Sequence, residues 1–190
     1  LSLCNKNFQK INNYSSNAKH NLLLDVCMAA NYEAQSLIPY HAQYEVQYPS
    51  SGSTFTMCTM LARSFADIGD IVRGRDLYHG KKKKKTETER DQLEQKLKGI
   101  FKKIHENLGT HEKKHYQNDT DNYYQLREDW WELNRETVWK AMTCEAPNNA
   151  KYFRGTCGGD EKTGILTPSQ CRCKDDQVPT YFDYVPQYLR

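Results

Sequence analysis

The most informative part of this chain is LARSFADIGDIVRGRDLY, residues 61–78, because it fits a helix but carries more charge than a core helix needs. From Phe55 to Val72 the apolar residues recur every three or four positions, which is the spacing of one face of an α-helix. Gly69 interrupts this helix, and charges of both signs occupy many of its other positions. The charged residues are Arg63, Asp67, Asp70, Arg73, Arg75 and Asp76.

Other helices are predicted on both sides of this one. The first spans about His20–Ser36, is apolar over most of its circumference and is therefore expected to be buried. Pro39 is expected to end it, because proline breaks the helical hydrogen bonding. The helix that contains residues 61–78 is expected to begin at Ser53 or Thr54 and to end near Gly74.

A third helix is predicted after a run of lysines. Thr86 and Glu89 form a capping-box pattern at its start, and Gly109 marks its end. Its apolar face consists of Leu93, Leu97, Ile100, Ile104 and Leu108.

A fourth helix is predicted over about Asp121–Met142, and the periodicity stops after Cys144, where glycines and prolines indicate loops. We therefore predict an all-α fold: a helical bundle with a disulfide-stapled loop region and little or no β-structure. The apolar face of the fourth helix is predicted to contain Leu126, Trp130, Leu133, Thr137 and Ala141, with Trp131 and Val138 beside it.

The composition indicates a folded chain with a large polar surface. Of the 190 residues, 37% are hydrophobic and 27% are charged, and an aromatic share of 12% argues against disorder. A formal net charge of +3 is too small to indicate a nucleic-acid partner by itself. No apolar run is long enough to span a membrane. The first residues lack a signal-peptide pattern, and we expect this chain to be part of a longer protein.

Four cysteines near the C-terminal end predict disulfides, because a loop-rich segment with a small core needs cross-links. Cys171 and Cys173 are too close in sequence to pair without strain. Two connectivities therefore remain: Cys144 pairs with one of them and Cys157 with the other. A zinc site of four thiolates is the alternative, but the C-x-C spacing differs from the C-x2-C spacing typical of such sites.

The other cysteines are Cys4, Cys27 and Cys58. We expect Cys27 and Cys58 to form disulfides as well, and the odd total leaves Cys4 as the residue without a partner in the chain. A chain rich in disulfides belongs in an oxidising, extracellular setting.

No catalytic site is predicted. Residues 111–115, HEKKH, match the H-E-x-x-H pattern of zinc hydrolases, in which two histidines on one helical face bind the metal. No apolar residues surround this motif to hold a metal site rigidly, so we interpret it as a solvated loop between helices. We expect neither a metal nor a cofactor.

The strongest local anomaly is a run of consecutive lysines, which is expected to be a loop because like charges repel. One interpretation is a solvated linker. The other is a binding site for a polyanion such as a sulfated glycan or an acidic membrane, with nucleic acid as the weakest option. The candidate glycan-binding residues are Lys81, Lys82, Lys83, Lys84, Lys85, Lys96, Lys98, Lys102 and Lys103.

Several motifs together resemble the Duffy-binding-like domain, specifically the alpha class of the malaria parasite's erythrocyte membrane protein 1 family. The motifs cover most of the chain and occur in the family's order. They are LLLDVCMAANYEAQS, CTMLARSFADIGDIVRGRDLY, TETERDQLEQKLKGIFKKIH, YYQLREDWWELNRETVWKAMTC, YFRGTCG and CRCKDDQVPTYFDYVPQYLR.

The resemblance implies a disulfide-stabilised helical adhesion module, not an enzyme, on the extracellular face of the infected erythrocyte membrane. It implies that residues 1–48 end a first subdomain and that residues 49–183 form the helical second subdomain with cysteine-rich loops. Residues 184–190 would begin a third subdomain.

The implied partners are a host-cell receptor or a sulfated or blood-group glycan, host antibodies, and neighbouring domains of the parent protein, but no nucleic acid. Such contacts underlie cytoadhesion or rosetting in the family, and heparan sulfate is one of the implied ligands. The alternative is a structural spacer and antigenic head domain whose neighbours carry the receptor binding. With either function, antigenic variation is expected to be tolerated in loops such as residues 81–85 and 148–154.

Overall fold

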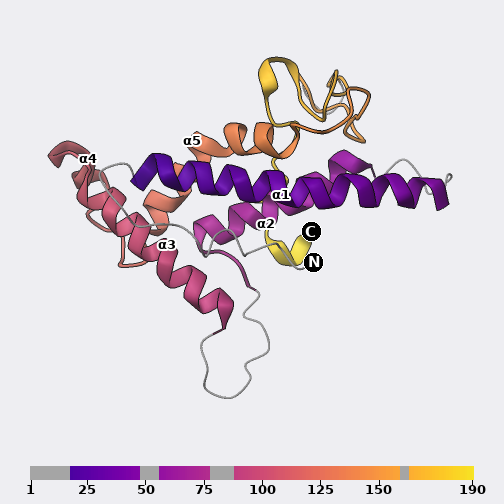
Figure 1. Cartoon of the computed structure of the whole chain (residues 1–190). Coiled ribbons are helices and arrows are strands. Elements are labelled where there is room, and N and C mark those ends of the chain that lie inside the picture. The colour runs from indigo at the N-terminus through magenta and orange to yellow at the C-terminus, as the bar shows by residue number, and fades with distance from the viewer. Residues whose placement is uncertain (1–17, 48–55, 78–87, 159–162) are drawn as a thin grey trace.

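The computed structural model describes residues 18–47, 56–77, 88–158 and 163–190, and its regular elements are helices (Figure 1). Among these residues the only β-type pairs are isolated bridges, so the predicted all-α fold is confirmed. No helix in the described ranges is long and apolar enough to cross a membrane. The elements are α1 (Ala18–Gln47), α2 (Met57–Arg73), α3 (Glu89–Glu106), α4 (Thr110–His115), α5 (Tyr124–Met142) and the 3-10 turns η2 (Lys174–Asp176), η3 (Phe182–Tyr184) and η4 (Gln187–Leu189).

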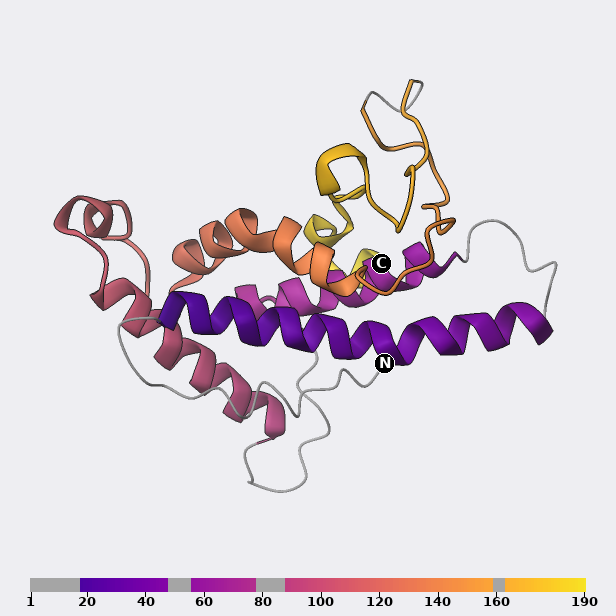
Figure 2. The same ribbon diagram turned by 45° about the horizontal axis from the view of Figure 1, so that its top comes forward.

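The long helices pack around one hydrophobic core. Figures 1 and 2 show α1 running the length of the molecule with α2 and α5 alongside it, while α3 crosses at an angle. The loops after α5 lie over one end of this bundle. Core residues come from all four helices, and the fully buried rings of Phe65, Phe101, Trp131 and Trp139 fill its centre.

Helix α1 is longer and more exposed than predicted. It continues through Pro39, although an interior proline costs a helix about 3 kcal/mol. Residues on both sides of the proline are buried, Ala34 before it and His41 after it, and their packing offsets that cost. The expectation of burial all round is wrong: Leu24 and Tyr32 are 60% and 44% exposed.

The starts of α2 and α3 lie slightly later than predicted. Thr56 caps α2, with its side chain accepting a hydrogen bond from the Thr59 backbone N–H at 3.3 Å, while the predicted caps at residues 53 and 54 lie outside the described residues. The capping box of α3 is formed by Thr88 and Asp91 instead of Thr86 and Glu89. The side chain that accepts a hydrogen bond from the N-cap backbone N–H is therefore an aspartate at the third helical position, where the sequence pattern predicted a glutamate.

The buried face of α5 differs from the predicted face because arginines occupy core positions. Leu133, predicted to be buried, is 75% exposed, whereas Arg127 is fully buried and Arg135 is 8% exposed. The apolar pattern cannot identify such a face, since a buried charge is stable only when specific partners surround it.

Arg127 joins α5 to both α2 and α3. Its guanidinium donates hydrogen bonds to the backbone carbonyls of Ile71 (3.0 Å) and Val72 (2.6 Å) at the end of α2. It also forms a two-pronged ion pair with Glu94 of α3, at 2.7 and 2.9 Å. The arginine therefore adds donors to two carbonyls in the last turn of α2, of which the Ile71 oxygen also accepts from the Gly74 N–H at 3.2 Å.

Asp183 in η3 gathers a second set of buried donors. Its carboxylate accepts hydrogen bonds from Arg135 at 2.7 and 2.9 Å and from the indole N–H of Trp131 at 2.9 Å. Arg73 of α2 donates to the Asp183 carbonyl oxygen. The C-terminal segment is thereby attached to α2 and α5 at once.

Arg190 joins the segment PQYLR (186–190), in which it lies, to the segment DIGDI (67–71) of α2. Arg190 pairs with Asp67 at 3.1 Å and with Asp70 at 2.7 Å. Burial raises the pKa of both aspartates, and the nearby Arg190 partly counteracts this. Several of the charges that distinguish α2 from a plain core helix thus bind the C-terminal segment.

Gly69 is required by close packing. A Cβ atom at this position would lie 2.8 Å from Cζ2 of Trp131, whose side chain is fully buried and has no room to shift. We expect Gly69→Ala to lower the free energy of unfolding by about 1–3 kcal/mol, because overpacking outweighs the gain in helix propensity. Gly99→Ala in α3 is the matched control, since nothing lies within 4 Å of its Cβ position, and it should stabilise by about 1 kcal/mol. Urea unfolding followed by tryptophan fluorescence measures both; equal effects would contradict the packing argument.

Removing the Asp183 carboxylate should be among the most destabilising changes in the chain. Asp183→Ala leaves the Arg135 guanidinium and the Trp131 N–H buried without their acceptor, which is expected to cost about 3–5 kcal/mol. Glu136→Ala, at an exposed position beside Arg135, should change stability by less than about 0.5 kcal/mol. Thermal and urea unfolding measure the difference, and a similar small effect for both variants would show that the carboxylate is dispensable.

Candidate functional site

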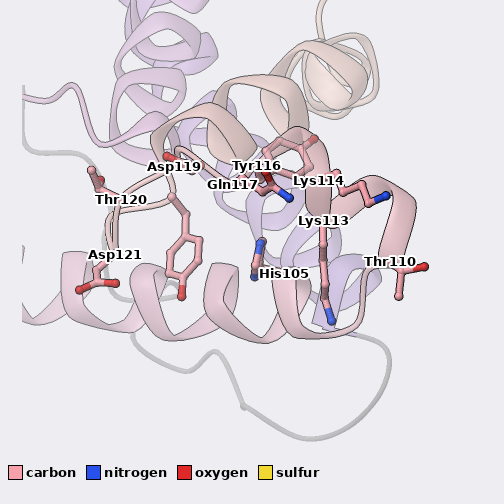
Figure 3. A pocket seen from close by; sticks show the side chains of 10 residues that line it. His105, Thr110, Lys113, Lys114, Tyr116, Gln117, Asp119, Thr120 and Asp121 are labelled. Carbon is pink, nitrogen blue, oxygen red and sulfur yellow. The ribbon is translucent and has the colours of Figure 1, made fainter.

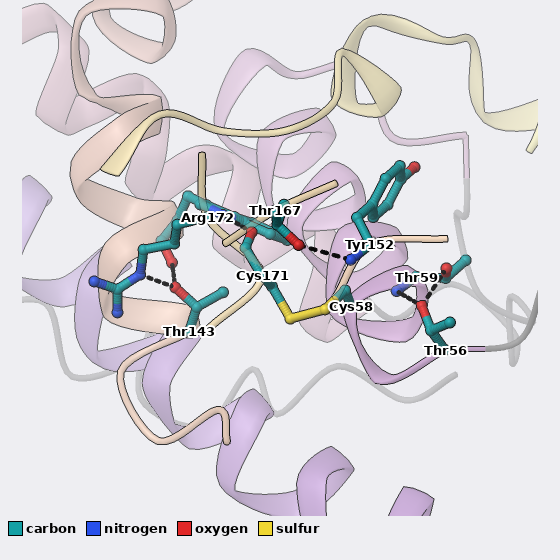
Figure 4. Close-up of a disulfide and its surroundings, with 9 residues drawn as sticks. Thr56, Cys58, Thr59, Thr143, Tyr152, Thr167, Cys171 and Arg172 are labelled. Carbon is teal, nitrogen blue, oxygen red and sulfur yellow. Dashed lines mark hydrogen bonds between the residues drawn. A yellow bond between two sulfur atoms is a disulfide. The ribbon is translucent and has the colours of Figure 1, made fainter. Parts of the chain in front are cut away.

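The loops after α5 are attached to the bundle by a long-range disulfide. Cys58, in the first turn of α2, bonds to Cys171, and the sequence separation is 113 residues (Figure 4). Closing so long a loop removes about 5 kcal/mol of conformational entropy from the unfolded chain. The indole N–H of Trp139 donates to the Cys171 carbonyl oxygen at 3.1 Å, so the loop is also held by α5.

A second disulfide lies within the loop region. Cys157 bonds to Cys173, and residues 157 and 165 form a short antiparallel bridge beside it. Figure 4 shows further bonds that fix the same region: the Tyr152 backbone N–H donates to the Thr167 hydroxyl at 2.9 Å, and Arg172 donates to the Thr143 hydroxyl at 2.7 Å.

The predicted disulfide pairing is wrong for Cys144. Neither Cys171 nor Cys173 is available to it, because these pair with Cys58 and Cys157, and Cys144 is an exposed free thiol. Cys27, also expected in a disulfide, is a half-buried free thiol on α1, and burial raises its pKa. Sequence spacing favours local pairs, whereas the fold brings the start of α2 next to residue 171. Cys4 lies outside the described residues.

The candidate glycan-binding lysines are only partly described. Lys81–Lys85 lie outside the described residues. On α3, Lys96 and Lys103 are seven residues apart and share one side of the helix, while Lys98 and Lys102 are four apart and share another. The two pairs lie along opposite edges of the exposed face of α3, on the side of the helix away from its buried stripe.

The HEKKH segment forms the short exposed helix α4, where a loop was predicted. A pocket of about 550 Å³ lies between this segment and the end of α3, with His105, Lys113 and Tyr116 around it (Figure 3). His115 approaches the Asp129 carboxylate at 3.6 Å and Gln125 at 3.1 Å. In the part of the chain that the structure describes, no three His, Cys, Asp or Glu side chains are grouped as metal ligands.

Tyr116 in the wall of this pocket is held by the same aspartate. Its hydroxyl donates to Asp129 at 2.9 Å, and burial together with this bond raises the pKa of Tyr116 to about 12. The phenol therefore stays protonated at any physiological pH and acts as a hydrogen-bond donor.

A large groove on the described surface was not anticipated from the sequence. A groove of about 970 Å³ lies between α2 and the disulfide-linked loops, and Arg63, Arg154 and Tyr181 are among its lining residues. The only sequence signal for it is Arg63, a charge on the polar side of α2. Arg154 and Tyr181 lie in aperiodic segments, and only the disulfides and the Asp183 contacts bring them to the same place.

The comparisons with known proteins agree with this fold. The family model for the Duffy binding domain matches residues 1–190. The crystal structure of the NTS-DBL1(alpha-1) domain of Plasmodium falciparum membrane protein 1 (PfEMP1), varO strain, is 39% identical with a TM-score of 0.77; the match covers 98% of this chain and 39% of that one. These matches confirm the resemblance to the alpha class.

Two further solved Plasmodium falciparum structures are similar. The NTS-DBL1-alpha and CIDR-gamma double domain from the varO strain is 39% identical with a TM-score of 0.76, over 98% of this chain and 25% of that chain. A DBLb domain of PfEMP1 bound to human ICAM-1 is 31% identical with a TM-score of 0.60, over 96% of this chain and 32% of that one. The present chain thus spans less than half of each solved chain. No curated protein sequence matches it.

The free and bonded cysteines can be distinguished by alkylation of the folded, non-reduced chain. Cys144 is exposed and should react first, while Cys27 should react several-fold more slowly because burial both hinders access and makes its thiolate scarcer. Peptide mapping by mass spectrometry identifies the labelled positions, and Cys144→Ser should remove the fast phase. Labelling of Cys58 or Cys171 without reductant would contradict the long-range disulfide.

Proposed function

Because this chain belongs to the Duffy binding domain family, we propose that it is an adhesion module of a variant surface antigen that contacts a receptor or glycan on host cells. The observation that carries this proposal is its similarity, at 31% identity and a TM-score of 0.60, to a PfEMP1 domain bound to human ICAM-1. The receptor of the present chain need not be ICAM-1, since that similarity concerns the scaffold and not a shared contact surface.

The proposed location is the extracellular face of the infected erythrocyte membrane, as part of a larger membrane-anchored protein. The disulfides Cys58–Cys171 and Cys157–Cys173 are consistent with an oxidising environment. The proposed partners are a host-cell receptor or a sulfated or blood-group glycan, host antibodies, and neighbouring domains; in one similar structure a CIDR domain accompanies the DBL domain. We propose no enzymatic activity, no cofactor, and no nucleic-acid partner.

The described architecture suits adhesion. A bundle fixed by buried ion pairs and a long-range disulfide holds surface loops with little loss of entropy on binding. Loops on such a scaffold can vary in sequence without changing the core, which is what an antigen under antibody pressure requires. We extend this proposal to the subdomain division at residues 48/49 and 183/184.

The basic residues at 81–85 and on α3 remain candidates for a glycan contact. Of the four lysines on α3, Lys102 is exposed and Lys96, Lys98 and Lys103 are half-buried. Since both pairs border the exposed face of α3, all four lysines lie on the solvent side of this helix.

The alternative function is a structural spacer and antigenic head domain. The observation that favours it is the coverage: this chain accounts for only 39% of the similar DBL1-alpha chain, so receptor contacts can lie entirely in the remainder. A spacer needs stability and a variable surface but no binding site.

Binding to heparin and to human red cells distinguishes these functions. We expect the oxidised chain to bind both, and replacement of Lys81–Lys85 by serine to weaken heparin binding by about tenfold or more at 0.15 M salt, since each exposed charge contributes about 0.3–0.5 kcal/mol.

The matched control removes the same charge elsewhere, by serine substitution of five lysines outside these candidates. If both variants weaken heparin binding equally, the lysines at 81–85 contribute only as part of a diffuse positive surface and do not form a specific site. Absence of any binding to heparin, red cells or receptor-bearing endothelial cells would favour the spacer. The control positions are Lys19, Lys113, Lys114, Lys151 and Lys174.

A further inference from the structure

The groove between α2 and the disulfide-linked loops has the size and shape of a ligand site. Its volume of about 970 Å³ lies at the upper end of the range for small-molecule pockets. One wall is the first half of α2, the second is the segment around residues 152–156, and the third is the segment 177–182. Each wall is fixed to the others, because Cys58 and Cys173 carry the two disulfides.

Aromatic rings form much of the surface of this groove. Tyr152 is buried, and its hydroxyl donates to Thr180 at 3.3 Å, so it supports the neighbouring Phe153 ring at a centroid distance of 4.9 Å. Tyr181 is 75% exposed, although the Arg135 guanidinium lies 5.2 Å from its ring centre on the protein side. A large aromatic ring held from one side and open on the other is a platform for the apolar face of a ligand ring.

The arginines of the chain divide into two groups. Arg63 and Arg154 are exposed, and within the described residues neither has a carboxylate partner; Arg154 contacts only the face of Phe153, at 5.0 Å. Every other arginine of the chain forms an ion pair with a carboxylate. These pairs are Arg73–Asp70, Arg75–Glu128, Arg90–Asp76, Arg127–Glu94, Arg135–Asp183, Arg172–Asp176 and Arg190–Asp70.

Both arginines line the same groove, and among the described residues its lining contains no aspartate or glutamate. In a chain where arginines are otherwise neutralised, two uncompensated guanidinium groups over one hollow create a local positive potential. Guanidinium groups bind carboxylates and sulfates through paired hydrogen bonds. Hydroxyl and amide groups of Thr156 and Gln177 add neutral hydrogen-bonding partners to the same lining.

We propose that this groove binds an acidic saccharide, with Arg63 and Arg154 contacting its carboxylate or sulfate and Tyr181 packing against a sugar ring. The two arginines suit an anionic group of the ligand, and the neutral polar side chains suit its hydroxyl groups. The exposed aromatic ring suits the apolar face of a sugar ring. The inference rests on the proposed adhesive function and specifies a site for it that is separate from the lysine run at 81–85.

Glycan binding to variants of the oxidised chain tests the site. The probes are 3′-sialyllactose for the carboxylate source, a heparin hexasaccharide for the sulfate source, lactose as the neutral ligand and inorganic sulfate as the free ion. We expect at least one acidic saccharide to bind in titration calorimetry, and Arg63→Ser and Arg154→Ser each to weaken it about tenfold or more, since hydrogen bonds to charged groups are lost. Arg63→Lys should retain part of the affinity.

Lys151→Ser is the matched control, because Lys151 is an exposed cation in the same loop that does not line the groove. Tyr181→Ala should weaken saccharide binding but leave the binding of inorganic sulfate unchanged. Circular dichroism and thermal unfolding verify that each surface variant remains folded.

The outcomes separate the groove from the adhesive function. If acidic saccharides bind all variants and the control equally, the proposed saccharide site in the groove is wrong, but the proposed adhesive function is not contradicted. The same conclusion follows if the chain binds red cells but none of the saccharides. If the chain binds neither cells nor saccharides, both the proposed saccharide site and the proposed adhesive function are wrong.

Discussion

The fold depends on the pairing of arginines that are buried inside a helical bundle. Arg73 is 1% exposed, Arg127 is fully buried and Arg135 is 8% exposed. A buried guanidinium without partners would cost several kcal/mol, so the surrounding elements are positioned to supply carboxylates and carbonyl groups. Arg127 thereby connects α5 to α2 and α3, while Arg73 and Arg135 bring the C-terminal segment onto the bundle. Apolar packing alone is non-directional, so it would not specify which groups meet at these contacts.

Apolar periodicity predicts the helices well because a helix can be recognised from the local spacing of its apolar residues. The segments of α2, α3 and α5, and the all-α class, follow from stripes of apolar residues such as Leu93 and Leu97, which are buried as expected. It fails where tertiary contacts override local preference. Pro39 lies inside α1, and the burial of Arg127 and Arg135 in place of Leu133 moves the core face of α5.

The candidate site follows from the sequence far less than the fold does. The groove exists because Cys58 meets Cys171 and because Asp183 fixes the segment that carries Tyr181, and both contacts join residues far apart in the chain. Sequence spacing instead favoured a bond from Cys144, and charge density favoured the lysine run. What distinguishes Arg63 and Arg154 is that no carboxylate in the described part of the chain pairs with them, and such a lack of partner is visible only in three dimensions.

The bond between Cys58 and Cys171 also determines how the molecule responds to mechanical load. In the proposed role as an adhesion module, the chain would be pulled by flow. Tension that enters before Cys58 and leaves after Cys171 passes through the sulfur–sulfur bond. The chain between the two cysteines, a sequence separation of 113 residues and so roughly 370–410 Å when extended, cannot be drawn out under that load. Helices α3, α4 and α5 are then shielded from the force, and the groove beside the disulfide keeps its shape under tension.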